Sequence, residues 1–577
     1  MKSTSVLKIL SLLSMVFFSC TPQADKMFTL MPSSVTGIDF RNPLQETEQF
    51  NVLNYGYLYN GGGVAIGDIN DDGFSDIYFT GNMVGSRLYL NQGNFKFKEI
   101  AEQAGVFASG LWNTGTTMAD VNGDGFMDIY VCRSAAKDFN KRKNLLFINN
   151  GDLTFTEKGE EYGVDDSGYS TQGAFFDYDK DGDLDLYVLN HSTQEYAGLG
   201  KISRHHKKQK NKSYSDKLMR NDNGKFVDVS DEAGLVSNIL GFGLGIAVSD
   251  LNNDSWLDLY ISNDYNEQDY LYLNNGDGTF SEQLEDYIGH VSLYSMGSDI
   301  ADINNDGLTD IMTLDMLPEG NYRIKMTSGP DNFEKLSHLE KNGFYNQTMR
   351  NMLQLNRGGD YFSEIGQFSG VSNTDWSWAS LFTDLDNDGF KDLFITNGYR
   401  KDYTNMDFMN YVVQEKINER KTKEKIQLKE LIDKMPSTIE ENYTYKNNGD
   451  LTFSKVNKDW GLDQKTLSNG AAYVDLDNDG DMDLVVNNID EKAFIYRNNA
   501  EKFTQNNYLK IALKGTGKNK FGIGAKVNVN SGGMMQTQEL LNTRGYQSSV
   551  DLNLIFGIGK STKVDQVEVI WPNQKKQ

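Results

Sequence analysis

The chain has 577 residues, of which 55 are glycine and only 7 are proline, and it carries a formal net charge of −25 with a pI of about 4.7. This length predicts one large repeat domain followed by a smaller one. The acidity argues against nucleic acid as a partner, because phosphate binding needs a basic face, and it leaves bound cations open.

The first 20 residues are organised like an export signal. Lys2 and Lys8 form a basic start, and residues 9–18 form an apolar run too short to span a bilayer. The run ends at Cys20, so the segment resembles a bacterial lipoprotein signal with Cys20 as the lipidated residue. An ordinary cleaved signal with an incidental cysteine is the alternative. The resemblance implies a protein anchored by lipid to the bacterial outer membrane, on its periplasmic or its surface face.

An acidic loop recurs seven times along the chain, in the form D-x-[DN]-x-D-G-x-x-D-[IL]. A run of β-branched and aromatic residues follows each copy and predicts a strand. Repeats of fixed form indicate one structural unit used many times. The acidic loops are numbered 1 to 7 here, and their first aspartates are Asp68, Asp120, Asp177, Asp250, Asp302, Asp384 and Asp475.

The acidic loops have the composition of a calcium site. Calcium takes six to eight oxygen ligands, which positions 1, 3, 5 and 9 can supply from side chains and position 7 from its carbonyl. Glycine at position 6 permits a sharp turn, and only Ser255 in loop 4 replaces it. A helix on each side and a glutamate at position 12 are missing, which excludes an EF-hand. Solvated acidic turns without metal are the alternative.

Up to seven Ca²⁺ ions are therefore predicted, with four side-chain ligands in each loop. Since aspartate has an ordinary pKa of about 3.9, the loops are not expected to relieve their repulsion by taking up protons at neutral pH. The predicted metal ligands are Asp68, Asn70, Asp72 and Asp76; Asp120, Asn122, Asp124 and Asp128; Asp177, Asp179, Asp181 and Asp185; Asp250, Asn252, Asp254 and Asp258; Asp302, Asn304, Asp306 and Asp310; Asp384, Asp386, Asp388 and Asp392; and Asp475, Asp477, Asp479 and Asp483.

A β-hairpin signal follows the strand after most acidic loops. Examples are SRLYLNQGNFKFKEI and NLLFINNGDLTFTEK, in which two alternating runs flank an Asn-Gly-type turn. With the strand before the loop, each unit holds four strands. Seven such units predict an all-β fold, a seven-bladed β-propeller.

The loops and their flanking strands resemble the FG-GAP or VCBS repeats of integrin α-subunits and bacterial secreted proteins. The tail, with GYQSSVDLNLIFGIG and VDQVEVIWPN, resembles the ASPIC/UnbV module that accompanies such repeats in the cartilage acidic protein family. The resemblance implies calcium binding and seven blades, and it implies no established activity. We expect a signal at 1–20, a tether and N-terminal strand at 21–49, the propeller at 50–505 and a small β-rich module at 506–577, with a further strand expected after its Trp571-Pro572.

The face opposite the acidic loops is predicted to bind a ligand. Three insertions gather there, at about 191–217, 316–350 and 399–442, and the last of them reads as a charged helix. Aromatic residues begin five of the innermost strands, and polar residues end six of the next strands on the same face. Such surfaces suit a sugar or a peptide, although aromatics that pack between blades are the alternative. The candidate residues are Trp112, Tyr169, Phe242, Tyr294 and Trp376, and Arg133, Asn190, Asn263, Asp315 and Asn397.

Motifs for catalysis are few. The five histidines have no zinc-binding spacing, and no G-x-S-x-G, Walker or catalytic-cysteine pattern is present. No catalytic residue is assigned, although Arg133, His191 and Tyr294 could serve a lyase-like enzyme on the insertion face. The predicted function is a lipid-anchored, calcium-binding module of the cell envelope that binds a glycan or an envelope protein. A polysaccharide-acting enzyme and a structural subunit of an envelope assembly are the alternatives.

Overall fold

The computed structural model describes residues 25–194, 202–329, 333–359, 361–423, 425 and 427–577. Cys20 and the predicted signal lie outside the described residues. The fold is all-β, as predicted, and its strands form small antiparallel sheets that follow one another along the chain. Within the described ranges, no helix combines the length and the apolar character needed to cross a bilayer.

Seven sheets carry the repeats among the described residues, and in each of them the strand before an acidic loop is the first of four repeat strands. Sheet 1 is extended to six strands by β36 (Thr543–Arg544) and β37 (Ser548–Ser549). Sheet 1 contains β2 (Val64–Gly67), β3 (Asp76–Phe79), β4 (Arg87–Asn91) and β5 (Phe97–Glu99), and sheet 2 contains β6 (Asn113–Ala119), β7 (Asp128–Arg133), β8 (Leu145–Asn149) and β9 (Phe155–Glu157). Sheet 3 contains β10 (Ser170–Phe176), β11 (Asp185–Asn190), β12 (Lys217–Asn221) and β13 (Phe226–Asp228), and sheet 4 contains β14 (Gly243–Ser249), β15 (Asp258–Asn263), β16 (Tyr270–Asn274) and β17 (Phe280–Glu282).

The remaining sheets keep this order but accommodate insertions. Sheet 5 contains β19 (Ser298–Ala301), β20 (Asp310–Thr313), β22 (Met352–Asn356) and β23 (Phe362–Glu364), and sheet 6 contains β24 (Ser377–Thr383), β25 (Asp392–Asn397), β27 (Tyr443–Asn447) and β28 (Phe453–Lys455). Sheet 7 contains β30 (Ser468–Val474), β31 (Asp483–Asn488), β32 (Phe494–Asn498) and, from the other end of the chain, β1 (Phe28–Leu30). A short helix follows the outer strand in five sheets: α2 (Ala101–Ala104), α3 (Gly159–Tyr162), α4 (Leu284–Tyr287), α7 (Gly366–Ser369) and α10 (Asn457–Trp460). In sheet 7, α1 (Ser33–Thr36) follows the outer strand β1, and α11 (Ala500–Phe503) follows the third strand β32.

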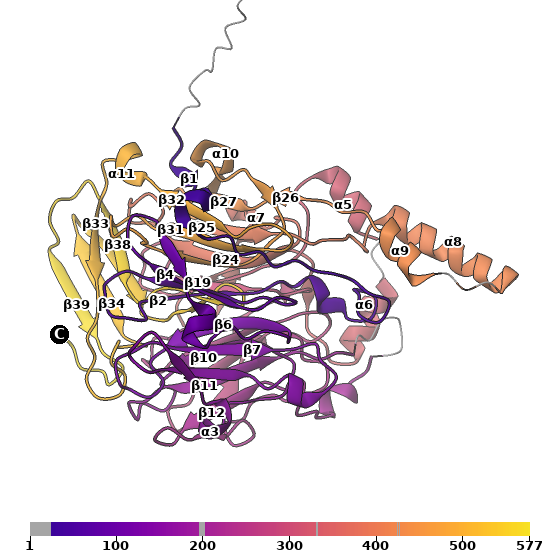
Figure 1. Cartoon of the computed structure of the whole chain (residues 1–577), viewed down its shortest axis with the longest axis horizontal. Coiled ribbons are helices and arrows are strands. Elements are labelled where there is room, and N and C mark those ends of the chain that lie inside the picture. The colour runs from indigo at the N-terminus through magenta and orange to yellow at the C-terminus, as the bar shows by residue number, and fades with distance from the viewer. Residues whose placement is uncertain (1–24, 195–201, 330–332, 360, 424, 426) are drawn as a thin grey trace, which may run out of the picture.

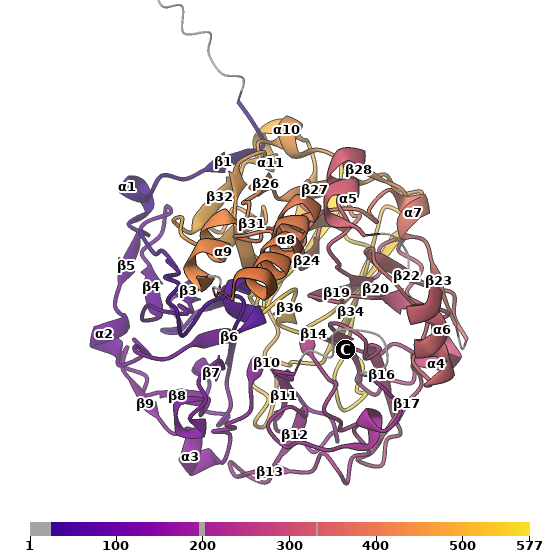
Figure 2. The same ribbon diagram turned by 90° about the vertical axis from the view of Figure 1, so that its right-hand side faces the viewer.

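The sheets stand around a common centre (Figure 2). The first strand of each sheet contacts the first strand of the next, and β30 of sheet 7 contacts β2 of sheet 1. Strand β1 pairs with β32 from Phe28 opposite Asn498 to Leu30 opposite Tyr496. The N-terminal strand therefore completes the sheet of the last repeat. Because the inner strands are enclosed by neighbouring sheets, they are buried on both sides, as all seven residues of β10 show.

The C-terminal region forms two small sheets on one face of the ring (Figure 1). One pairs β33 (Asn507–Ile511) with β38 (Leu554–Gly559), and the other orders β35 (Met534–Glu539), β34 (Lys526–Ser531) and β39 (Gln566–Ile570). Between β35 and β38 the chain enters the centre of the ring. Residues 540–551, called the axial segment here, include β36 (Thr543–Arg544) and β37 (Ser548–Ser549).

The axial segment contacts the inner strands of all seven sheets. Strand β37 lies parallel to β2, and the carbonyl of Gln547 accepts a hydrogen bond of 3.0 Å from the backbone of Thr116. The Gln172 side chain donates to the carbonyl of Ser548 at 3.1 Å, and the ring of Tyr546 lies 5.0 Å from that of Trp378. Since Tyr546 and Ser548 are fully buried, this segment fills the middle of the ring.

The three insertions lie on the opposite face (Figure 1). They contain η3 (His206–Lys208), α5 (Asn321–Thr327), α6 (Phe333–Lys341), α8 (Met406–Thr422) and α9 (Leu428–Lys434), with the short pairs β18 (Val291–Ser292) with β21 (Gln347–Thr348) and β26 (Glu440–Glu441) with β29 (Lys465–Thr466). The third insertion is two helices and not one. Lys423 takes a left-handed backbone with φ of 62° and ends α8, so α9 must begin afresh.

Candidate functional site

The aspartate at position 9 has the same role in every acidic loop. In loop 1, the carboxylate of Asp76 accepts hydrogen bonds from the backbone N–H of Ile69 at 3.0 Å and of Asn91 at 2.7 Å. The corresponding two bonds are present in the other six loops. Position 9 therefore ties the loop to the third strand of its sheet.

The aspartate at position 1 closes the turn. Its carboxylate accepts from the backbone N–H of position 6 in all seven loops, as Asp68 does from Gly73 at 2.7 Å. In loop 4 the donor is Ser255 at 3.0 Å, and Ser255 takes φ of 74° where the other loops have glycine. Loop 4 thus folds like the rest at the cost of a strained serine.

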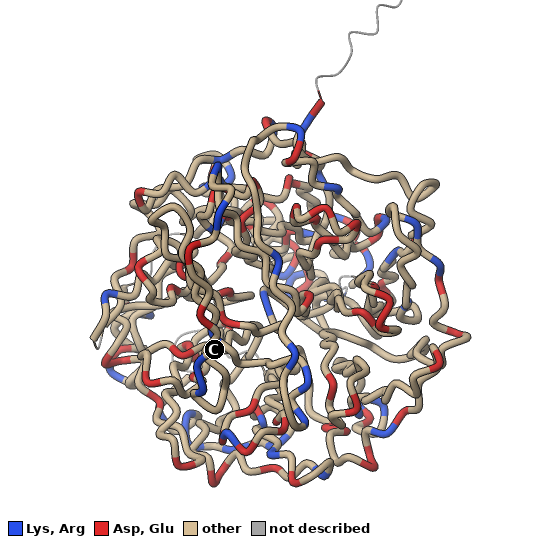
Figure 3. Tube along the Cα trace, turned by 90° about the vertical axis from the view of Figure 1, so that its left-hand side faces the viewer, with Lys and Arg blue, Asp and Glu red and all other residues tan. Residues whose placement is uncertain are grey.

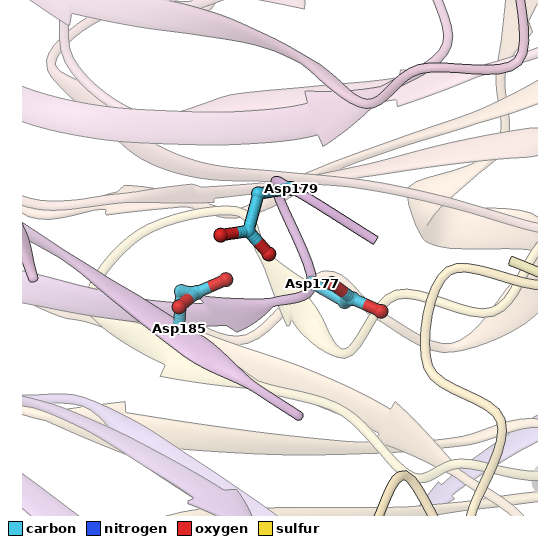
Figure 4. A group of neighbouring side chains, drawn as sticks. All are labelled: Asp177, Asp179 and Asp185. Atoms are coloured by element: carbon cyan, nitrogen blue, oxygen red, sulfur yellow. The ribbon is translucent and has the colours of Figure 1, made fainter. Parts of the chain in front are cut away.

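Carboxylates converge most closely in loops 3, 6 and 7. In loop 3 the oxygens of Asp177, Asp179 and Asp185 lie within 4.8 Å of one another (Figure 4). The corresponding groups are Asp384, Asp386 and Asp392 in loop 6, and Asp475, Asp477 and Asp479 in loop 7, beside which Asp479 and Asp481 form another with Glu501. These are the loops with aspartate at position 3. Where position 3 is asparagine, its amide donates to position 5, as Asn70 does to Asp72 at 2.9 Å.

Several buried carboxylate oxygens in the loops have no hydrogen-bond donor among the described residues. They are one oxygen each of Asp177, Asp183, Asp250, Asp386, Asp475 and Asp477. An ionised carboxylate oxygen that is buried without a partner is costly. A divalent cation that coordinates such oxygens removes this cost, so the donor set fits a calcium ion.

Burial changes the acidity of the loops. It raises the pKa of Asp76 to about 8, of Asp128 to about 7 and of Asp185 to about 9, because the buried charged form loses its hydration. The expectation that the loops cannot take up protons at neutral pH is therefore wrong for position 9. That expectation used the ordinary pKa of an exposed aspartate, and these side chains are almost fully enclosed.

Basic side chains from neighbouring segments reach the same three loops. Lys446 pairs with Asp386 and Asp388 in loop 6, and Arg497 lies 3.0 Å from Asp477 in loop 7. The C-terminal region adds Lys510, 3.0 Å from Asp475, and Lys518, 2.7 Å from Asp183. Acidic and basic segments accordingly lie side by side on this face (Figure 3). These cations neutralise part of the charge of the loops without satisfying the unpartnered oxygens.

The five candidate aromatics lie on the opposite face, as predicted for their strands. Trp112, Phe242 and Trp376 are buried, and Tyr169 and Tyr294 are half-buried. Residues 50–59, which include η1 (Gly56–Tyr59), pack over several of them. Phe50 makes an edge contact with Trp112 at 5.3 Å, and Tyr57 makes one with Phe242 at 5.8 Å.

The five candidate polar residues are buried and bonded within the chain. Asn190, Asn263 and Asn397 bond to nearby backbone groups, as Asn263 does by accepting from Phe242 at 3.1 Å. Asp315 accepts from the backbone of Leu293 and Tyr294, and the Arg133 side chain donates to Asn113 at 3.2 Å. These side chains hold the starts of the aromatic-bearing strands in place.

Two cavities open beside these aromatics. The first mouth cavity, of about 210 Å³, is lined by Leu53, Asn54, Tyr55, Gly56, Tyr57, His191, Ser192, Thr193 and Phe242. The second mouth cavity, of about 200 Å³, is lined by Gly56, Tyr57, Asn60, Asp264, Tyr265, Tyr294, Met296, Met316, Trp376, Trp378, Tyr399, Tyr403 and Thr404. Three of the candidate aromatics thus border a cavity, and the residues Gly56 and Tyr57 line both.

Sequence reasoning missed most of the tyrosines of the second mouth cavity. Tyr265 and Tyr399 stand two residues after the strand-end residues Asn263 and Asn397. An aromatic at that offset in two repeats is a signal that could have found them. Tyr57 carries no such signal, because it belongs to the segment before the first inner strand.

His191 belongs to a buried hydrogen-bonded group. Its Nε2 lies 2.8 Å from Ser134 Oγ, and Tyr55 OH lies 3.2 Å from the same hydroxyl. Burial lowers the pKa of His191 to about 4, so the ring is neutral. Among the described residues, no hydrogen bond, ion pair or ring contact joins Arg133, His191 and Tyr294 to one another.

Comparison with known families identifies the class of protein that this repeat and tail define. Residues 55–131, 135–188 and 250–313 match the FG-GAP-like repeat, and residues 515–577 match the family described as ASPIC and UnbV. The chain thus carries FG-GAP-like repeats and an ASPIC/UnbV domain.

The similarity to individual proteins extends over nearly the whole chain, and the chain is homologous to cartilage acidic protein 1. It is 24% identical to the Homo sapiens protein over 581 residues, which is 96% of this chain and 73% of that one. It is 23% identical to the Mus musculus protein over 582 residues, covering 96% and 75% of the two chains. A solved structure on specific recognition of non-reducing terminal N-acetylglucosamine by an Agrocybe aegerita lectin is 17% identical, with a TM-score of 0.36 and coverage of 68% and 79%.

Proposed function

We propose that the protein is a calcium-stabilised, seven-bladed β-propeller of the bacterial cell envelope that binds a glycan or an envelope protein on its insertion face. FG-GAP-like repeats are those of a binding or adhesion module, and this chain carries them. The proposal adds a ligand class, a cation and a location to that coarser statement.

The observation that carries the binding role is the pair of mouth cavities. Both open at the centre of the face that holds the insertions, and aromatic rings line both. Aromatic walls with a few buried polar groups are typical of ligand sites, and long loops on a rigid scaffold are where binding resides. Loops that differ from repeat to repeat give this face a specific shape.

Calcium is assigned to the acidic loops on the opposite face. The unpartnered buried oxygens and the converging carboxylates of loops 3, 6 and 7 support this assignment. Positions 1, 3 and 5 would hold the ion with the carbonyl of position 7, and position 9 would add one of its oxygens. Bound calcium supplies charge neutralisation and stability here, and no chemistry on a ligand.

The binding role is tested with the soluble domain from residue 21 onward. The domain is applied to a glycan array and, immobilised, to detergent-solubilised native envelopes. Array binding indicates a glycan, and capture of one protein in stoichiometric amount indicates a protein partner. A domain that binds neither, yet sediments with a large envelope assembly, would instead support a structural subunit. New reducing ends or unsaturated sugars in a panel of polysaccharides would indicate an enzyme.

The lipid anchor is tested by Cys20→Ala. If Cys20 carries the lipid, the variant should leave the membrane fraction or remain unprocessed, since stable anchoring needs acyl chains. Cys132→Ala is the matched control, because Cys132 is buried in β7 and should leave membrane retention unchanged. Membrane retention of Cys20→Ala at the level of the unmodified chain would contradict the anchor.

A further inference from the structure

The second mouth cavity is built by segments far apart in the chain. Tyr57 and Asn60 come from the segment before sheet 1, Asp264 and Tyr265 follow sheet 4's second strand, and Trp376 and Tyr399 flank the first two strands of sheet 6. Trp378 also lines it, and its ring packs against Tyr546 of the axial segment at 5.0 Å. The axial segment therefore closes the cavity on the side of the ring centre.

Buried polar atoms of this cavity lack partners. The indole N–H of Trp376 makes no hydrogen bond among the described residues, although the side chain is only 7% exposed. Asn60 is 4% exposed, and its amide N and O likewise make no hydrogen bond of standard geometry, although the Tyr546 phenol is nearby. Buried polar groups are almost always paired, so each unpaired one needs an explanation.

A further polar group of the cavity is an acceptor held in place. The carboxylate of Asp264 accepts from the Tyr57 hydroxyl at 2.9 Å and from the backbone of Tyr265. The cavity thus offers N–H donors from Trp376 and Asn60 and acceptors from Asn60 and Asp264. Its walls are rigid, because Trp376 stacks on Tyr399 with ring centroids 3.6 Å apart and planes inclined by 9°.

We infer that the second mouth cavity binds a single neutral sugar ring at the end of a glycan, an inference that rests on the glycan form of the proposed function. A sugar hydroxyl both donates and accepts, so a ring with several hydroxyls can satisfy the amide, the indole and the carboxylate together. Its apolar C–H face suits the aromatic walls. A volume of about 200 Å³ is below that of sites for larger ligands, so one ring fits and a longer chain does not.

An organic cation is the competing ligand, because aromatic rings beside a carboxylate also suit an ammonium group. Such a cation has no acceptor to offer the two N–H donors. It would leave the Trp376 indole and the Asn60 amide unpaired and buried, which the sugar does not.

The test uses the soluble domain from residue 21 with defined probes. Methyl glycosides of glucose, galactose, mannose and N-acetylglucosamine, and separately tetramethylammonium, are titrated in calorimetry and in saturation-transfer NMR. Trp376→Phe keeps a ring in the stack and removes only the indole donor, and we expect it to weaken the bound glycoside at least tenfold. Asn60→Leu should weaken it similarly by a different route.

Trp460→Phe is the control. Trp460 ends α10, where its ring lies 6.3 Å from that of Phe28, and it lines neither mouth cavity. It should leave affinity unchanged, and all three variants are compared only when their melting temperatures match that of the original domain. If Trp376→Phe does not fold, Asn60→Leu decides the question.

Three results would overturn the inference. They are binding of tetramethylammonium in place of every glycoside, equal weakening by Trp376→Phe and Trp460→Phe, and no glycoside binding while the domain still binds the glycan array. In the last case the proposed function stands and the sugar site lies elsewhere. Failure of both the array and the glycosides, with a protein captured from envelopes, would remove the glycan form of the function as well.

Discussion

The two faces of the ring differ in how they repeat. On the loop face, positions 1 and 9 make the same backbone hydrogen bonds in all seven sheets, even where Ser255 replaces glycine. On the insertion face, the residue that precedes the inner strand varies among Trp, Tyr, Phe and non-aromatic residues, and the insertions differ from sheet to sheet. The repeated face is thus tied to stability, and the varied face is free to determine what is bound.

Removal of calcium should have the largest effect, which is a loss of stability that arises on the loop face. Linkage predicts about 2.7 kcal/mol of stabilisation per site at a hundredfold excess over Kd, so EDTA should lower the melting temperature by on the order of 10 °C or more. Calcium should restore it better than magnesium, whose octahedral geometry is stricter. Scanning calorimetry and metal analysis measure both. A melting temperature indifferent to EDTA, with no calcium in the purified protein, would refute the assignment.

Truncation of the axial segment should weaken both faces together. Tyr546 is fully buried against Trp378, and Tyr546→Ala should cost about 3–5 kcal/mol of unfolding free energy because it leaves a cavity. Tyr322, which is 78% exposed in α5, is the control, and Tyr322→Ala should stay within about 0.5 kcal/mol. Denaturant titration compares them. Equal midpoints for the two variants would show that the segment adds little to the ring.

His191 should give the insertion face a pH dependence of its own. Its folded pKa of about 4 lies below the ordinary value of about 6.5, so its contribution is complete above pH 6.5 and is lost as the pH falls through about 4. The loss of unfolding free energy should reach about 3 kcal/mol, and the His191→Gln variant should not show this loss. The difference between the two proteins is the quantity to measure, since buried carboxylates such as Asp216, with pKa raised to about 7, titrate with the opposite sign. Parallel pH curves would contradict the prediction.

The smallest predicted effect is a difference in calcium-dependent stability between two acidic loops of the loop face. Loop 3 brings three carboxylates together, whereas loop 4 has asparagine at position 3 and the strained Ser255. Asp177→Ala should therefore remove more of the calcium-dependent stability than Asp250→Ala, by about 1–2 kcal/mol. Melting each variant with and without EDTA isolates this part. The reverse order would show that carboxylate number does not set affinity here.

Much of the loop face could be predicted from the sequence, because its determinants are local. The aspartates at positions 1 and 9 bond to backbone groups a few residues away or in the next hairpin, so the spacing alone carries the structure. The pKa values could not be predicted in this way. Whether an aspartate is enclosed depends on neighbouring sheets, and enclosure is what raises the pKa of Asp185 to about 9.

The contacts at the centre of the ring could not be predicted from local sequence patterns. The backbone of Gln547 donates to the side chain of Gln172, 375 residues away, and such polar contacts between distant segments leave no periodic pattern. For a similar reason, the sequence did not indicate what the strand-end polar residues bond to. Their position was visible in the sequence, but the backbone groups of Gln268 and Leu293, to which Asn263 and Asp315 bond, were not.

The pairing of β1 with β32 in sheet 7 determines when the ring can close as the protein is synthesised. The amide of Asn499 donates to the carbonyl of Met27, 472 residues earlier, beside the pairing of β1 with β32. At roughly 5–20 residues per second, β1 waits about half a minute to a minute and a half for its partner strand to be synthesised. Until then sheet 1 and sheet 6 have no neighbour on one side, and the middle of the ring is open because the axial segment comes later still. An unfinished ring thus exposes strand edges that pair readily with other chains, and we expect the newly made protein to depend on chaperones until both ends are in place.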